Sequence, residues 1–192
     1  DHIENQIALA KAGAIAPLVE LLGTDSTETQ EHAVGALLHL ASQDVASRNA
    51  VVKRLVETLS LRNATAQMKA AEALAVLASK SDDNRKAITA ASAIEPLVKL
   101  LGDGRRVRTA TPQERAAAVL SDLARSSDNK KTIVEAGGVP PLVEMTKTGS
   151  PEAQTHAAAA LWQLAALGSN RPAIAEAGAI KPLVALLSSA PE

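Results

Sequence analysis

The sequence predicts an all-α fold built from stacked helical repeats, and two observations lead to this prediction. The block AGAIAPLVELL at Ala12–Leu22 returns in similar form at Ala91–Leu101, Ala136–Thr146 and Ala177–Leu187, with a degraded copy at Arg54–Leu59. The leucines that index these blocks follow one another at steps of 37, 42, 45 and 41 residues. A period of about 41 residues is typical of helical repeat arrays and not of a globule with one central core.

Each full repeat is predicted to contain three helices, as the fourth copy shows most clearly. A short helix over Asn129–Glu135 is broken by the glycines 137–138, and Pro141 opens a second helix that ends near Gly149. Ser150 is the expected N-cap of a third helix that runs to about residue 168.

The predicted third helices share one apolar stripe. Counted from a second index leucine, apolar residues recur at positions −4, −3, 0, +3 and +4, a helical spacing. The second index leucines are Leu37, Leu74, Leu120 and Leu161. This stripe is the expected core, so positions −5, −2, +1 and +2 are left for solvent or a partner.

Composition and motifs argue against most other classes of function. The chain has no Phe, Tyr or Cys, one Trp, and a net charge of −1 from 20 basic and 21 acidic residues. This balance supplies no general field for nucleic acid, and a lack of cysteine excludes disulfides and weakly favours a reducing compartment. We expect a cytoplasmic or nuclear protein without membrane insertion. No catalytic or metal motif is found, so we expect no enzyme activity, cofactor or metal.

A short first helix, a glycine bend (Gly13, Gly137 and Gly178), a Pro-Leu-Val start and a long Ala/Leu helix resemble the armadillo repeat family. The resemblance covers essentially the whole chain. It implies a right-handed α-solenoid whose third helices line a concave groove that binds partner proteins. The repeats are placed at about 1–43, 44–80, 81–126 and 127–168, with a partial repeat at 169–192. We expect a fragment of an array that continues beyond both ends.

Two repeats depart from the pattern. The second has NAVVKR at residues 49–54, where a helix end, glycine and proline are expected, and its first step is about four residues short. We predict that its first helix is shortened or merged with its second. The third repeat has four extra residues within Gly102–Gln113, which we predict to form an exposed loop before a capping box at Thr111–Glu114.

The expected partner-binding groove is lined by third-helix residues outside the apolar stripe. Position −5 is basic or potentially basic in every copy, which suggests an extended and partly acidic partner, with the single Trp as an aromatic anchor. The alternative is that the −5 residues are solvated charges. The candidate groove residues are His32, Gly35, His39, Lys69, Glu72, Val76, Arg115, Asp122, His156, Trp162 and Gln163.

Three further patterns were considered. Nuclear-import adaptors of the family carry Trp at −2 and Asn at +2 of their third helices. Neither residue stands at those positions in this chain, so binding of basic import signals is not expected.

Arg105, Arg106 and Arg108 could contact an anion, or belong to a solvated insertion. Asparagines stand 13 residues before four index leucines and are expected to satisfy backbone groups where a loop enters the first helix; they are Asn5, Asn84, Asn129 and Asn170.

The sequence leaves two functional hypotheses open. The first is a non-catalytic scaffold that binds a partner peptide or domain along the groove. The second is a purely structural spacer or packing subunit in a larger assembly. An exposed groove of mixed charge favours the first hypothesis, whereas a continuous apolar flank favours the second.

Overall fold

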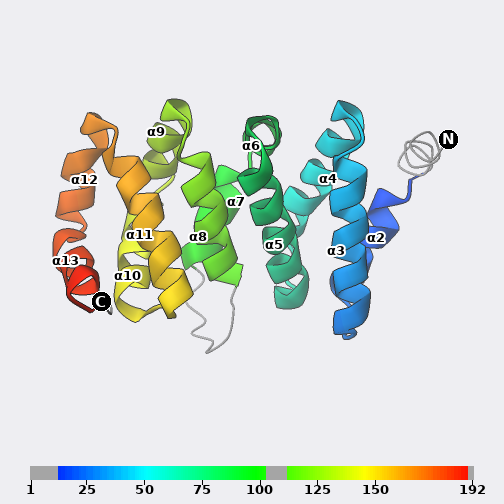
Figure 1. Cartoon of the computed structure of the whole chain (residues 1–192), viewed down its shortest axis with the longest axis horizontal. Coiled ribbons are helices and arrows are strands. Elements are labelled where there is room, and N and C mark those ends of the chain that lie inside the picture. Colours follow the sequence, from blue (N-terminus) through cyan, green and yellow to red (C-terminus); the bar gives the residue numbers. More distant parts are fainter. Residues whose placement is uncertain (1–12, 103–111, 190–192) are drawn as a thin grey trace. The chain divides into compact units, whose positions relative to one another are not determined.

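The computed structural model describes residues 13–102 and 112–189, where every regular element is a helix (Figure 1). The fold is all-α, as predicted. The helices are α2 (Ile15–Leu21), α3 (Thr27–Ala41), α4 (Val45–Thr58), α5 (Ala64–Lys80), α6 (Asp82–Ala90), α7 (Ile94–Gly102), α8 (Pro112–Leu123), α9 (Ser127–Glu135), α10 (Val139–Thr148), α11 (Pro151–Ala165), the 3-10 turn η1 (Gly168–Asn170), α12 (Arg171–Glu176) and α13 (Ile180–Ser189).

The long third helices are α3, α5, α8 and α11, and polar N-caps start three of them. The side chains of Ser26, Asn63 and Ser150 accept hydrogen bonds from backbone N–H groups three residues on, at 3.2, 3.0 and 3.1 Å. The N-cap predicted at Ser150 is therefore confirmed. The cap predicted at Thr111 lies outside the described residues. Helix α11 ends at Ala165, short of the predicted end at residue 168, because η1 begins the next repeat there.

The first and second helices of the second repeat are merged, which is one of the two alternatives that the sequence leaves open. Helix α4 runs unbroken from Val45 to Thr58, where the other repeats have two helices. Neither glycine nor proline interrupts this stretch, and Asp44 caps its start by accepting the Ser47 N–H at 2.9 Å. The missing bend thus converts two short helices into one.

The chain divides into two compact halves, residues 1–96 and 97–192. In the first half, α2 contacts α3 and α4, α3 contacts α5, and α4 contacts α5 and α6. In the second half, α8 and α10 both contact α11, and α10 also contacts α12 and α13. The predicted apolar stripe forms the core of each half, since the second index leucines are fully buried in both.

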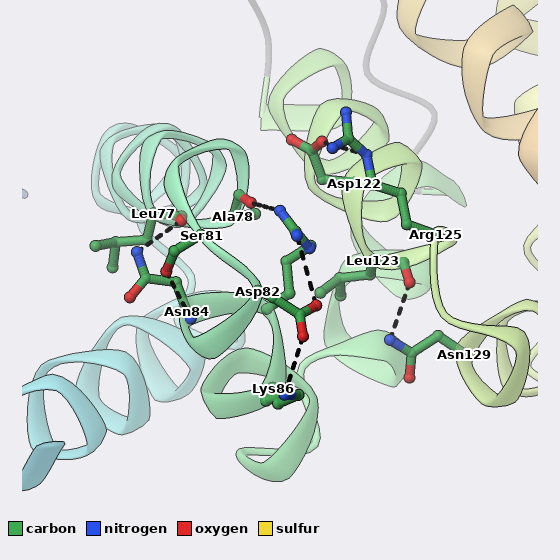
Figure 2. A network of polar contacts seen from close by, with 11 residues as sticks. Leu77, Ala78, Ser81, Asp82, Asn84, Lys86, Asp122, Leu123, Arg125 and Asn129 are labelled. Atoms are coloured by element: carbon green, nitrogen blue, oxygen red, sulfur yellow. Dashed lines mark hydrogen bonds and ion pairs between the residues drawn. The ribbon is translucent and has the colours of Figure 1, made fainter.

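The regularly spaced asparagines are buried and donate to backbone carbonyls. Asn84 Nδ2 donates to the Leu77 carbonyl at 2.8 Å, and Asn129 Nδ2 donates to the Leu123 carbonyl at 3.0 Å (Figure 2). Each accepting carbonyl lies in the last turn of a third helix, where intrahelical N–H donors run out; the Leu123 carbonyl also accepts the Ser126 N–H at 3.1 Å. The prediction that they satisfy backbone groups is confirmed for Asn84, Asn129 and Asn170, whereas Asn5 lies outside the described residues.

Asn170 joins two repeats as well as capping a helix. Its amide donates to the Leu164 carbonyl of α11 and to the Lys130 carbonyl of α9, both at 3.2 Å. The arginine after it donates from Nε to the Ala165 carbonyl at 2.9 Å. In the first half, Arg85 follows Asn84 in the same way and donates to the Ala78 carbonyl at 2.8 Å. An Asn-Arg pair thus satisfies successive carbonyls at the end of a third helix.

An exposed ion pair supports the first turn of α6. Lys86 Nζ lies 2.9 Å from Asp82 Oδ2 (Figure 2), and the hydrogen bond between these groups lowers the pKa of Asp82 and raises the pKa of Lys86. Because the Asp82 pKa is lowered, its contribution is present above its ordinary value of 3.8 and is lost as the pH falls through the lowered value. Solvent exposure keeps this contribution small.

The bend between the first and second helices of a repeat requires a residue whose backbone adopts the left-handed conformation, with positive φ. Gly137 has φ +80° and Gly178 has φ +76°. At the first of these bends, the Gly137 and Gly138 N–H groups donate to the carbonyls of Val134 and Ile133 at 3.0 and 2.9 Å. This is a Schellman motif. In the third repeat Ser92 takes the glycine's place and adopts φ +58°.

We predict that Ser92→Gly raises the free energy of unfolding by about 1 kcal/mol, because glycine adopts positive φ without the steric cost that serine bears. Urea denaturation of the whole chain checks this. Gly137→Ala is the matched control and should lower stability by a similar amount, since its Cβ would meet open space and the backbone alone is strained. An unchanged or lower stability for Ser92→Gly would contradict the argument.

We predict that Asn170→Ala lowers the free energy of unfolding by about 1–3 kcal/mol, because it removes the hydrogen bonds from the Asn170 amide to the Leu164 and Lys130 carbonyls. The same denaturation measurement applies. Asn49→Ala is the control: Asn49 is exposed on α4, so its replacement by a better helix former should be neutral or slightly stabilising. Equal effects of the two substitutions would refute the role assigned to Asn170.

Candidate functional site

In the first half, the candidate face of α3 is open to solvent. His32, Gly35 and His39 are all exposed. A Cβ atom added to Gly35 would meet nothing within 4 Å, although this glycine stands inside a helix where it lowers stability. No side chain covers the helix backbone at Gly35, between His32 and His39, so a partner atom could approach the backbone closely.

The face of α5 differs from the prediction at Lys69. This lysine is only 8% exposed, and its Nζ lies 3.3 Å from Glu72 Oε2. Position −5 of α5 is covered, whereas the same position on α3 is open at His32. Lys69 is thus not a free groove cation, and its charge is balanced locally. Glu72 and Val76 are half-buried on the same helix.

In the second half, α8 contributes Arg115 and Asp122, both half-buried. The Nε of Arg115 is buried without a hydrogen-bond partner among the described residues. Asp122 Oδ1 lies 3.5 Å from Nε of the exposed Arg125 (Figure 2). The face of α8 therefore holds one ion pair and one half-buried guanidinium.

Helix α11, which contacts α8, supplies the aromatic residue. Trp162 is 71% exposed, the highest value for a large hydrophobic side chain on the described third helices. His156 and Gln163 are half-buried on the same helix. An exposed indole of this kind offers both an apolar surface and an N–H donor to a partner.

The charge pattern of the third-helix faces is mixed. With Lys69 paired, the basic row at −5 is reduced to His32, Arg115 and His156, and pairs of opposite charge stand on α5 and α8. The arginines of the predicted anion-contact loop, Arg105, Arg106 and Arg108, lie outside the described residues. A face of mixed charge is the kind of surface expected for peptide binding.

The described ranges contain neither a metal-ligand cluster nor a helix suited to cross a membrane. Across residues 13–102 and 112–189, no group of three or more His, Asp or Glu side chains is placed to hold a metal ion. None of the helices in those ranges combines the length and hydropathy that a bilayer crossing requires.

Sequence reasoning missed an apolar surface on α13. Ile180, Val184 and Leu187 are all exposed, although the residues at the same places in the block on α10 are buried. The available signal was positional: α13 follows the last long third helix, α11, so no later repeat within the described residues can cover it.

This arrangement defines an all-α helical repeat protein, with buried Ala/Leu stripes and polar third-helix faces. The model of the armadillo/beta-catenin-like repeat matches residues 2–42 and 126–166. Solved structures agree along nearly the whole chain, as described below. The chain belongs to the armadillo repeat family.

Three solved structures illustrate the likeness. A structure of computationally designed armadillo repeat proteins for modular peptide recognition is 29% identical, with a TM-score of 0.73, covering 98% of this chain and 81% of that one. A designed armadillo repeat protein in complex with the peptide (KR)4 is 28% identical, with a TM-score of 0.72 and coverage of 98% and 80%. An engineered protein is 35% identical, with a TM-score of 0.73 and coverage of 98% and 78%.

A natural relative matches over one repeat length. U-box domain-containing protein 14 of Arabidopsis thaliana is 50% identical over 40 residues, which is 21% of this chain. The match spans only 6% of the length of that protein.

We predict that Gly35→Ala raises the free energy of unfolding by about 0.5–1 kcal/mol, because alanine favours the helix and its methyl group meets open space. Thermal or urea denaturation checks this. Gly149→Ala is the control and should destabilise, because its Cβ would lie 2.7 Å from the Met145 carbonyl oxygen. A loss of stability in Gly35→Ala would show that the space above Gly35 is not open.

Proposed function

We propose that this chain is a non-catalytic protein-interaction scaffold that binds an extended peptide along the groove lined by its third helices. The observation that carries the proposal is the division of the third helices into a buried apolar stripe and a less buried face, which is open on α3 and at Trp162 of α11. Structural relatives of the same fold support it, since one set was designed for modular peptide recognition and another is in complex with a peptide.

The partner proposed here differs from the basic peptide (KR)4 of that relative. Positions −2 of the third helices hold Gly35, Glu72, Ala118 and Ala159, and no Trp stands among them. Instead, the basic or potentially basic groups His32, Arg115 and His156 suit carboxylates, and the planar guanidinium of Arg115 suits them best. We therefore propose a partly acidic segment that places an apolar side chain on Trp162.

Rigidity supports binding by such a face. The side chains at −5, −2, +1 and +2 are set on helices whose opposite sides are close-packed, so little backbone ordering is required when a peptide docks. A peptide that gains one large aromatic contact and one or two charge-assisted hydrogen bonds would then bind with most of its affinity in a few residues.

The cytoplasm is the compartment that we propose, with the nucleus as the second choice. The support is compositional: a chain of 192 residues without cysteine forms no disulfide, which weakly favours a reducing compartment.

The test uses the intrinsic fluorescence of Trp162, the one tryptophan of the chain. Peptides are selected from a random library against the whole chain and titrated while the emission is followed. We expect an acidic consensus and a change in emission on binding. Trp162→Ala, followed by calorimetry, should weaken binding about tenfold to a hundredfold, and Arg115→Ala about tenfold.

The matched control truncates an exposed apolar side chain elsewhere. Leu61, which lies between α4 and α5 and is exposed, should be replaceable by alanine without effect on peptide affinity. Binding that survives Trp162→Ala, Arg115→Ala and His32→Ala together would contradict the proposal. Selection of basic peptides would retain the scaffold function but contradict the acidic partner.

A further inference from the structure

The histidines of the described residues all lie on third helices. His32 and His39 belong to α3 and His156 belongs to α11, at positions −5 and +2 of the proposed peptide-binding face. Histidine is the side chain whose ordinary pKa lets its charge change between pH 5 and 8. Asp, Glu, Lys and Arg side chains with ordinary pKa values keep their charges across that range. The net charge of this face therefore depends on pH near neutrality.

The openness of this face is a property of the position within the repeat. At +2, His39 is exposed and its counterparts on the other third helices are half-buried; they are Val76, Asp122 and Gln163. At −5, His156 is half-buried although α11 contacts α8, and Arg115 at the same place on α8 is half-buried as well. Solvent and a peptide thus reach His39 and His156, and His32 adds a further exposed imidazole on α3.

The charges around His39 are balanced. Helices α2, α4 and α5 contact α3, and these four helices carry five basic and five acidic side chains, which are Arg48, Lys53, Arg54, Lys69, Lys80, Glu20, Glu28, Glu31, Glu57 and Glu72. Two of the acids are already paired, Glu57 with Arg54 at 3.1 Å and Glu72 with Lys69 at 3.3 Å.

The imidazole of His39 is not engaged by any of these acids. Its Nε2 lies 3.3 Å from Nε2 of Gln43, and none of the ion pairs within residues 13–102 includes a histidine. A proton taken up by His39 is therefore not matched by a carboxylate of the chain, and it adds positive charge to the face.

His156 has acids and bases around it, but no ion pair within residues 112–189 includes it. Helices α8, α9, α10 and α12 contact α11. The charged side chains of these helices and of α11 itself are Arg115, Lys130, Lys131, Lys147, Arg171, Glu114, Asp122, Asp128, Glu135, Glu144, Glu152 and Glu176. Three of the acids are paired with basic side chains at 3.4–3.6 Å; they are Asp122, Glu135 and Glu144.

Position −5 brings a guanidinium and an imidazole to two helices in contact. Arg115 stands there on α8 and His156 on α11. Two cations at this level repel each other, and a carboxylate of a bound peptide stabilises both. Binding of an acidic side chain therefore favours the protonated form of His156.

We propose that this face binds its acidic peptide more tightly as the pH falls from about 7.5 to about 5.5, because His32, His39 and His156 gain protons that the bound carboxylates stabilise. The inference rests on the proposed function and adds the regulation of the same face.

Proton linkage gives the direction of the effect. A peptide that prefers the protonated face takes up protons when it binds, and protons in turn favour the peptide. The peptide stays acidic, because the ordinary pKa values of Asp and Glu lie near about 4. Each imidazolium–carboxylate contact that is open to solvent should strengthen binding about twofold, so three contacts should change the dissociation constant about fivefold to tenfold.

The first experiment selects peptides from one random library against the whole chain at about pH 7.5 and at about pH 5.5. We expect more Asp and Glu among the peptides selected at the lower pH. An acidic peptide from that selection, chosen to contain no His, is then titrated by calorimetry at both values. Its dissociation constant should be about fivefold to tenfold lower at the lower pH.

A second measurement counts protons. Near pH 6.5, calorimetry in phosphate and in bis-Tris, whose ionisation enthalpies differ, should show net proton uptake by the complex. In the combined variant His32→Gln, His39→Gln and His156→Gln, the uptake should vanish and the two dissociation constants should become equal. Val76→Ala is the matched control, since it alters position +2 of α5 without a titratable group, and it should keep the full pH dependence.

A control peptide tests the role of the carboxylates. Replacement of each Asp by Asn and each Glu by Gln should abolish the pH dependence of binding. Circular dichroism of every variant at both pH values checks that the chain is folded.

Each other outcome overturns the proposal. Equal acidic content in the two selections, or an affinity that does not rise as the pH falls, would show that protonation does not serve binding. A pH dependence that persists in the combined variant would assign it to other groups. Peptide binding that is independent of pH would leave the proposed function intact. Selection of no acidic peptide at either pH would contradict the acidic partner of the proposed function as well.

Discussion

Alanine at the helix contacts is the constraint on which the other features depend. Four long helices bring Ala and Leu to the same five positions, and the chain has no Phe or Tyr to fill larger spaces. Small side chains let helix backbones approach closely, so each repeat packs against the next with little spare volume. In such a core an added methylene forces neighbours to move. The apolar positions therefore have little freedom to vary, and differences between repeats concentrate on the faces that point away from this contact.

Close packing also explains why the ends of the third helices need buried asparagines. A helix whose last turn is enclosed by the next repeat cannot leave its carbonyls to water. Asn84, Asn129 and Asn170 donate to these carbonyls from the following repeat. The asparagine therefore links one repeat to the next, and its regular place in the sequence follows from the regular place of the helix end that it satisfies.

The sequence predicted the fold to the level of single helices because the repeat supplies its own alignment. Copies of one block identify the second helices, and the absence of glycine and proline between Val45 and Thr58 predicts the merged α4. The candidate site was harder to predict. Helical periodicity predicts on which side of α5 the Lys69 side chain lies. The burial of Lys69 depends on the helices that pack around α5, and the pattern of one helix gives no information about them. Ser92 is a similar case, since the block predicts a bend and only the backbone shows its positive φ.

The same argument accounts for the open face of α13. A periodic sequence assigns Val143 and Val184 the same environment, because they stand at the same place in the block. Burial, however, depends on the neighbouring helices: Val143 is 1% exposed on α10, which contacts α11, α12 and α13, whereas Val184 on α13 is 56% exposed. Hydrophobic stabilisation follows the area removed from water, so equal residues contribute unequally.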